Sequence, residues 1–235
     1  LEELVKERTR KLEVVNQEMQ NAKEESERLL LNILPQETAD ELRRFGQTTA
    51  KRFDNVSVLF CDIVDFTKLS MNLGPVDLVA DLDLYFKAFD DICLKHGLEK
   101  IKTVGDAYLA AGGIPENNHA DANDVLDCAL AMQAYVDEVK DRRKALSRSF
   151  YQIRIGVHTG SVVAGVVGSR KFQYDIWGDT VNVAARLQQS SEPGRINISQ
   201  TTKTLVETKF QCTPRGKLEA KNKGTLAMYF VEGRI

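Results

Sequence analysis

The sequence predicts an α/β (α+β) sandwich, with helices packed on a sheet, preceded by a long coiled-coil helix. Residues 1–44 of the 235 contain no aromatic residue and no glycine, whereas from Phe53 onward short apolar runs alternate with amphipathic segments. A charged segment without aromatics suits a solvated helix, and alternating strands and helices suit layers around one core. We therefore divide the chain into a coiled-coil helix over 1–34, a linker with a short helix over 35–52, and a globular domain over 53–235.

The composition excludes several classes of protein. Lys and Arg number 32 and Asp and Glu 34, so a net charge of −2 predicts no nucleic-acid partner. The longest uncharged run, Ile155–Ser169, contains four glycines and is shorter than the roughly 20 apolar residues of a membrane span. The sequence shows no secretory signal. Its four cysteines form no C-x-x-C pair, which indicates reduced thiols and a cytoplasmic location.

The N-terminal segment carries an apolar seam with a 3.5-residue repeat. Steps of four and three from Leu1 reach Ile33 through ten positions, of which only Arg8 and Ser26 are polar. Such a repeat predicts a left-handed coiled coil, and a second copy of the chain is its simplest partner. The alternative is a single helix docked on its own domain. Pro35 interrupts the helix, and a second helix is expected at about Glu37–Arg44.

The remaining elements follow from periodicity and turn residues. Turns are expected at Gly105-Asp106 and at Gly160, and Asp179 is the expected N-cap of its helix. Strands are expected at Val56–Cys61, Leu98–Val104, Ala107–Ala111, Gln152–Val157 and Val162–Val167. Helices are expected at Pro75–His96, Ala120–Lys144 and Asp179–Gln189, and a hairpin with a basic turn at Phe210–Val231.

Two aspartates stand where a cation could bind. Asp62 ends an apolar strand, and Asp106 lies in a glycine turn between two strands. Mg²⁺ takes one or two carboxylates and completes its shell with water and phosphate oxygens. Backbone N–H groups at the helix start beside Phe66 and Thr67 could meet the phosphates. Either aspartate taken alone is better interpreted as a cap or turn residue.

Two further pairs of side chains could bind a nucleotide. Asn182 and Arg186 are four residues apart on a predicted helix and share a face. An amide and a guanidinium placed in this way could bind a sugar and a phosphate. Lys221 and Lys223, in the predicted basic turn, could meet a polyphosphate. Each pair has an alternative interpretation as solvated surface.

Four separated motifs carry a resemblance. Phe60–Thr67, Lys102–Tyr108, Gly156–Gly160 and Tyr174–Arg186 together resemble the class III nucleotidyl cyclase catalytic domain, in the same order and spacing. The resemblance covers about residues 53–231. The segment Leu29–Pro35 also resembles the one that precedes the catalytic domain in sensor-type cyclases, so residues 1–34 are expected to be a signalling helix.

The resemblance implies a fold and a set of roles. The implied fold is a ferredoxin-like sandwich with a C-terminal β-hairpin, working as a head-to-tail homodimer in which each subunit supplies part of each site. Two Mg²⁺ or Mn²⁺ ions would bind Asp62, Asp106 and the Ile63 carbonyl. The remaining roles are adenine reading by Lys102 and Asp175, ribose and transition-state contacts by Asn182 and Arg186, and triphosphate binding by Arg170 and Lys221.

These expectations combine into an adenylyl cyclase that converts ATP to 3′,5′-cyclic AMP and pyrophosphate. The alternatives are a guanylyl cyclase, a catalytically inactive nucleotide-binding dimerisation module and a structural coiled-coil adaptor. Asp65 departs from the family pattern, which has a small residue there, often glycine. His158 is expected to be structural. We also expect a sensor upstream of Leu1, which would place a membrane-bound full-length protein's cyclase domain on the cytosolic face.

Overall fold

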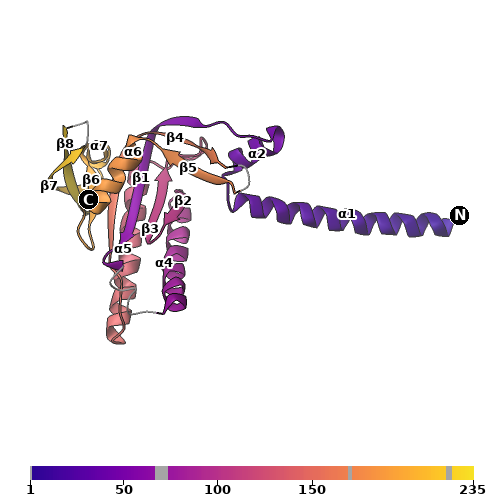
Figure 1. The fold of residues 1–235 in the computed structure, drawn as a ribbon, viewed down its shortest axis with the longest axis horizontal. Helices are drawn as coiled ribbons and strands as arrows, with labels where there is room; N and C mark the ends of the chain where they lie inside the picture. Colours follow the sequence, from indigo (N-terminus) through magenta and orange to yellow (C-terminus); the bar gives the residue numbers. More distant parts are fainter. Residues whose placement is uncertain (1, 67–73, 169–170, 221–223) are drawn as a thin grey trace. The chain divides into compact units, whose positions relative to one another are not determined.

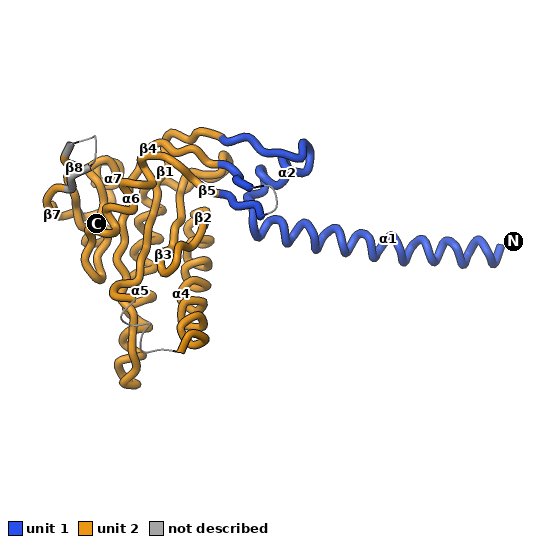
Figure 2. The backbone as a smooth tube through the Cα atoms, in the orientation of Figure 1, with its two compact units in different colours: residues 1–50, 165–174 blue, residues 51–164, 175–235 orange. Residues whose placement is uncertain are grey.

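The computed structural model describes residues 2–66, 74–168, 171–220 and 224–235. The chain forms two compact units (Figure 2). One comprises residues 1–50 and 165–174, and the other comprises residues 51–164 and 175–235. Three of the predicted site residues, Thr67, Arg170 and Lys221, lie outside the described residues, as does Lys223.

The N-terminal unit contains two helices, α1 (Glu2–Leu31) and α2 (Gln36–Phe45). No residue of α1 is buried, and its predicted seam is exposed, with Leu12 at 62% and Met19 at 66% of their full surface. Pro35 is the N-cap of α2, and Gly46 ends this helix with a φ of 69°. The long helix is consistent with the expected coiled coil, and the described residues of its own unit leave the apolar seam exposed.

A mixed sheet forms the centre of the larger unit (Figure 1). Its strand order is β2-β3-β1-β4-β6-β8-β7, with β5 paired to β4. Among these pairs β4 and β6 run parallel, whereas β1 is antiparallel to both β3 and β4. The strands are β1 (Lys51–Ile63), β2 (Glu99–Val104), β3 (Ala107–Gly112), β4 (Ile153–Val167), β5 (Gln173–Trp177), β6 (Ile196–Ser199), β7 (Phe210–Ala220) and β8 (Gly224–Arg234).

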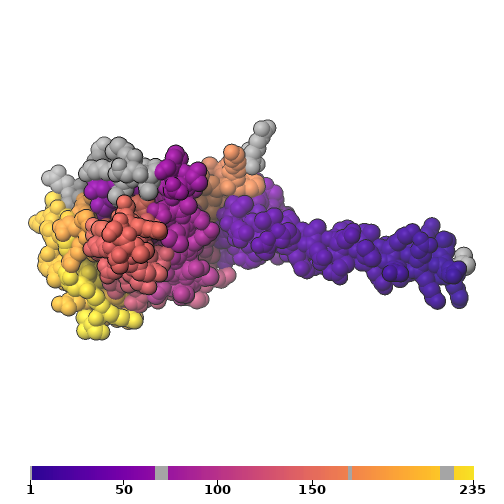
Figure 3. Space-filling model, turned by 90° about the horizontal axis from the view of Figure 1, so that it is seen from below, coloured from indigo at the N-terminus to yellow at the C-terminus, as the bar shows by residue number. Residues whose placement is uncertain are grey.

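Helices α4 (Pro75–Lys95) and α5 (Ala122–Ala145) cover one face of the sheet and lie side by side (Figures 1 and 3). Alternate residues of β1, including Leu59 and Cys61, point into the core that these helices close, because side chains alternate along a strand. Arg143 of α5 joins the helices through two hydrogen bonds to the Asp81 carboxylate, at 2.6 and 2.9 Å.

Helix α6 (Asp179–Gln189) packs on the other face of the sheet. The β4 residues on either side of Gly156 belong to the core beneath α4 and α5, so Gly156 itself faces α6. A Cβ at Gly156 would lie 2.1 Å from the Gln188 nitrogen and 2.5 Å from the Ala184 carbonyl oxygen. Only glycine lets the helix backbone approach the strand this closely.

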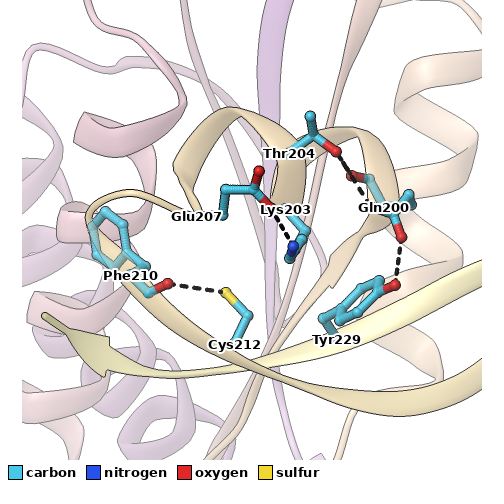
Figure 4. Close-up of polar contacts among 7 residues, drawn as sticks. All are labelled: Gln200, Lys203, Thr204, Glu207, Phe210, Cys212 and Tyr229. Carbon is cyan, nitrogen blue, oxygen red and sulfur yellow. Dashed lines mark hydrogen bonds and ion pairs between the residues drawn. The ribbon is translucent and has the colours of Figure 1, made fainter.

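Helix α7 (Gln200–Val206) follows β6 directly and is tied to the C-terminal hairpin. The Tyr229 hydroxyl of β8 donates to the Gln200 side chain, and Lys203 pairs with Glu207 (Figure 4). The predicted hairpin over Phe210–Val231 is confirmed as β7 and β8.

Two local predictions were wrong. Gly160 is not a turn, because β4 runs unbroken from Ile153 to Val167. A Cβ at Gly160 would lie 2.7 Å from the Thr180 hydroxyl, so this glycine makes room for the start of α6. Asp179 is not the N-cap of α6: Gly178 holds that position with a φ of 141°, and Asp179 is the first helical residue.

The structure also contains elements that were not expected. Strands β5 and β6 and helix α7 are all short, with seven residues or fewer each. None of the helices described is both long enough and apolar enough to cross a membrane.

Candidate active site

Asp62 lies near the end of β1, directly opposite Arg154 of β4 in the antiparallel register. The Arg154 guanidinium donates to Asp62 Oδ2 from Nε at 3.1 Å and from Nη2 at 2.8 Å. The buried Gln188 amide of α6 donates to the same oxygen at 3.0 Å. Neither Arg154 nor Gln188 was singled out from the sequence, because each contact joins residues about a hundred positions apart.

Asp106 lies in the turn between β2 and β3, beside Asp62. The register pairs Asp62 with Ala107, which brings the turn to the end of β1. Burial raises the pKa of Asp106, and the negative charge of Asp62 raises it further. Two carboxylates that oppose each other's ionisation form a site that a cation would stabilise.

The donors at this place fit a hard divalent cation. Within the described residues no group of three or more His, Cys, Asp or Glu side chains is placed to hold a metal. A pair of carboxylates suits Mg²⁺, which is bound by one or two carboxylates together with substrate phosphates. Ile63, the last residue of β1, buries its side chain in the core, so only its backbone could serve as a ligand.

Asn182 and Arg186 lie on a different face of α6 from Gln188. At 100° per residue, Arg186 is rotated by about 200° from Gln188, and Asn182 by about 240°. Asn182 is exposed and Arg186 partly exposed, and neither side chain makes a hydrogen bond within the described part of the chain. The helix therefore turns one face to Asp62 and presents the predicted ribose and transition-state residues away from it.

Lys102 of β2 and Asp175 of β5 lie together, as the resemblance implies for a base-reading pair. Lys102 Nζ is 2.5 Å from Asp175 Oδ2, and the side chains are 29% and 12% exposed. The second oxygen of Asp175 accepts from the Ile176 N–H at 2.9 Å. The pair thus offers a fixed donor and a fixed acceptor at a partly buried position.

The segment after β1 carries two further predicted features. Phe66 is partly buried and packs against the core. Asp65 has a φ of 55°, in the left-handed region that favours glycine. This conformation explains why glycine suits the position and why aspartate, which tolerates it better than most residues, is accepted there.

A cavity of about 390 Å³ opens elsewhere, at the start of α6 between β4, α7 and β8. His158, Trp177 and Thr180 are among its lining residues, and none of the described residues in the predicted site lines it. His158 Nδ1 lies 2.7 Å from the Ser199 hydroxyl, within a group of buried hydroxyls. The hydrogen bond agrees with the structural role expected for His158.

Residues 48–233 match the family model described as the adenylate and guanylate cyclase catalytic domain. The chain belongs to this family. The class III cyclase resemblance is thereby confirmed, and so is the mixed α/β fold of the cyclase catalytic domain.

Curated relatives of this cyclase domain include both substrate types. The receptor-type guanylate cyclase gcy-23 of Caenorhabditis elegans is 39% identical over 242 residues, covering 100% of this chain and 21% of that protein. An adenylate cyclase of Mycobacterium bovis is 38% identical over 217 residues, covering 92% of this chain and 48% of that protein. The chain thus spans about half or less of these relatives' length, and they do not decide between ATP and GTP.

Solved cyclase domains share the fold. The guanylate cyclase domain of RhGC from Catenaria anguillulae, in complex with GTP, has a TM-score of 0.72 at 33% identity, covering 79% of this chain and 100% of that one. A dimeric guanylyl cyclase domain from Blastocladiella emersonii, described as non-canonical, has a TM-score of 0.70 at 31% identity, covering 79% and 99%.

Proposed function

We propose that this chain is the catalytic domain of an adenylyl cyclase, which converts ATP to 3′,5′-cyclic AMP and pyrophosphate. One observation carries the proposal most strongly: Asp62 and Asp106 lie together, while Asn182 and Arg186 point away from them on α6. A cation site and a predicted transition-state pair that lie on different faces of α6 suit a site shared by two copies.

The reaction is an in-line displacement at phosphorus. The ribose 3′-oxygen forms a bond to the α-phosphorus, the bond from that phosphorus to the pyrophosphate oxygen breaks, and the 3′-hydroxyl proton leaves to solvent. Asn182 orients the ribose, and the Arg186 guanidinium stabilises the charge that develops on the phosphoryl oxygens. Arg170 and Lys221 hold the triphosphate, with the backbone at Phe66 and Thr67.

Asp62, Asp106 and the Ile63 carbonyl would hold the divalent cations, Mg²⁺ or Mn²⁺, of which we propose two per site. Such ions lower the pKa of an attacking hydroxyl and neutralise charge on both sides of a displacement. The two adjacent carboxylates support this assignment, because the charge of Asp62 opposes the ionisation of Asp106 when no cation is bound.

Lys102 and Asp175 support ATP over GTP. Adenine presents an amino donor at N6 and an acceptor at N1, so Asp175 accepts from the first and Lys102 donates to the second. Guanine reverses both polarities and leaves the polar groups of the site unpaired. A guanylyl cyclase is the second candidate, because relatives of both kinds match the chain at similar identity.

A homodimer would complete the site. We propose that two copies associate head to tail through the catalytic domain, residues 53–235, and in parallel through the signalling helix, residues 1–34. The exposed apolar seam of α1 supports the second contact. Asp62, Asp106, Asn182 and Arg186 are all present in this one sequence, which disfavours an inactive dimerisation module.

The proposal is tested by incubating the protein with ATP or GTP and Mn²⁺ and identifying the product by mass. Cyclic AMP from ATP, with far less cyclic GMP from GTP, is the expected result. Asp106→Ala should remove nearly all turnover, because losing a cation ligand costs several kcal/mol of barrier, and should keep the fold. Exposed Asp83→Ala on α4 is the matched control. A folded Asp106→Ala protein with near-normal turnover would overturn the cation assignment.

A further inference from the structure

We propose that Asp90 and Lys100 position Lys102, the donor of the base-reading pair, by anchoring strand β2 to helix α4. The inference rests on the function proposed above, since it takes Lys102 as a contact of the nucleotide base. It adds two positioning residues, which act on the base through the strand that carries Lys102.

The two lysines of β2 point to opposite faces of the sheet, although residues two apart in a regular strand share a face. Lys100 pairs with Ala110 of β3, which belongs to the core beneath α4. The register then shifts, and Lys102 pairs with Leu109, where unbroken pairing would place it opposite the next residue, Tyr108. Partners across an antiparallel pair share a face. The bulge therefore directs Lys100 toward α4 and Lys102 toward the other face, where Asp175 lies.

Three polar contacts gather on the Asp90 carboxylate, near the C-terminal end of α4. The Lys100 ammonium lies 2.7 Å from Oδ1 and 2.8 Å from Oδ2. The Tyr108 hydroxyl of β3 donates to Oδ1 at 2.6 Å, and burial raises the pKa of this hydroxyl, which keeps it protonated. Lys100 Nζ also lies 5.3 Å from the centroid of the Tyr108 ring, a cation–π distance. One carboxylate of α4 thus holds both strands of the β2–β3 hairpin.

The position of β2 depends on this anchor because β2 is an edge strand. Within the described residues its only strand neighbour is β3, and the pairing between them is interrupted at the bulge. The ion pair of Lys100 with Asp90 holds β2 on one side of the bulge, and that of Lys102 with Asp175 holds it on the other. Without the first pair, Lys102 keeps its charge and loses part of its fixed placement. A misplacement of about 1 Å can cost about 100-fold in rate.

Four variants separate positioning from stability. Lys100→Met keeps an unbranched stem and removes the ammonium, and Asp90→Asn removes the charge but keeps an acceptor for Tyr108. The two side chains are 38% and 41% exposed, and ion pairs at such positions contribute little to the free energy of unfolding, so both variants should fold. Lys100→Arg keeps the charge and is the rescue variant. Lys87→Met is the matched control, because it removes an exposed ion pair with Asp83 that lies within α4.

Steady-state kinetics of the full chain with ATP and with GTP, in the presence of Mn²⁺, measure the effect. Lys100→Met and Asp90→Asn should each raise KM for ATP about tenfold or more and lower the ATP-over-GTP ratio of kcat/KM by a similar factor. The value of kcat should change less, because the base is contacted in the bound substrate and in the transition state alike. Lys100→Arg and Lys87→Met should stay within about threefold of the unmodified protein. A loss of folded protein alone would lower kcat and leave KM and the ratio unchanged.

The outcomes distinguish the anchor from the base-reading role itself. If Lys102→Met leaves KM for ATP unchanged, or if the unmodified protein uses ATP and GTP equally well, the base-reading role is wrong and the anchor has nothing to position. If Lys102→Met raises KM for ATP but folded Lys100→Met and Asp90→Asn proteins keep KM and the ratio within about twofold, the anchor is wrong and the base-reading role stands. A loss confined to kcat in these two variants also overturns the anchor. Thermal unfolding establishes that each variant is folded.

Discussion

Lys102 and Asp175 form a salt bridge that neutralises both charges inside one chain, yet each keeps hydrogen-bonding capacity. An ammonium has three donors and a carboxylate about four acceptor sites, so their 2.5 Å contact uses only part of each. A pair of this kind is stable before a base arrives and presents a fixed polarity to it. Reversing that polarity should change which base is accepted.

Changing Lys102→Glu and Asp175→Cys together should lower kcat/KM for ATP and raise it for GTP. A glutamate can accept from guanine N1–H, and a thiol is a weak donor to O6. We expect the unmodified protein to prefer ATP by a factor on the order of 100 or more, less than the largest known rejections because water can soften a mismatch. Either change alone should mainly reduce activity, because one of the two hydrogen-bonding groups would then match adenine and the other guanine.

Kinetic assays with both nucleotides on the four proteins measure this. A protein that makes cyclic GMP as efficiently as cyclic AMP contradicts the base-reading role. An unchanged ATP preference in the double variant contradicts it too.

Glu99, on edge strand β2, gives a stability prediction that is independent of catalysis. Burial raises the pKa of Glu99 to about 7. The folded state therefore holds this proton more tightly than the unfolded state, and the free energy of unfolding should fall as pH rises from about 5 to 7. Glu99→Gln keeps the shape without the charge and should be more stable at pH 8, by up to about 3 kcal/mol.

Urea unfolding at pH 5 and pH 8 checks this, with the difference between the two proteins as the measured quantity. Equal stabilities of the two proteins at both pH values would show that Glu99 titrates normally.

Among the elements, α6 depends most on a single backbone position. Gly156→Ala would place a methyl group against the Gln188 nitrogen and the Ala184 carbonyl, both rigid backbone atoms. We expect a loss of about 3 kcal/mol or more in the free energy of unfolding, since overpacking against backbone cannot be relieved by a rotamer change. Gly74→Ala should cost much less, because among the described residues the new methyl group would meet only the Asp77 side chain, at 3.2 Å.

The sequence predicted elements well where the signal is local. The long helices and the C-terminal hairpin follow from periodicity and turn residues, and the structure confirms them. Gly160 was misread because a glycine that makes room for a neighbouring helix looks the same in sequence as one that makes a turn. Short elements such as β6 carry too few residues to show a period.

The residues of the predicted site also divide into those that local motifs reveal and those that depend on contacts between distant parts of the chain. Family motifs identified Asp62, Asp106, Lys102 and Asp175, and the structure brings each pair together. Arg154 and Gln188 were missed because their contacts with Asp62 depend on the β1–β4 register and on the approach of α6 at Gly156. The visible signal was an arginine two residues before Gly156, and it acquires meaning only when the pairing of the strands is known.

At the scale of the whole molecule, the two faces of α6 point to a shared site. The face that contacts Asp62 is buried against its own sheet, while Asn182 and Arg186 are presented outward. One copy can thus contribute the cation ligands of one site and the transition-state residues of another. In a symmetric head-to-tail pair, each of two sites would draw on both chains.

Mixing experiments test this directly. Asp62→Ala and Arg186→Ala proteins should each be inactive alone, because every site in either homodimer lacks one essential group. Mixed together, they should regain activity, since a heterodimer contains one site with all residues intact. Random exchange makes about half the dimers mixed, with one good site of two, so about a quarter of the unmodified activity is the ceiling.

Mixing Asp62→Ala with Asp106→Ala is the control and should stay inactive, because both changes remove cation ligands supplied by the same subunit. No recovery in the first mixture, with subunit exchange demonstrated by differently tagged chains, would place the whole site within one chain.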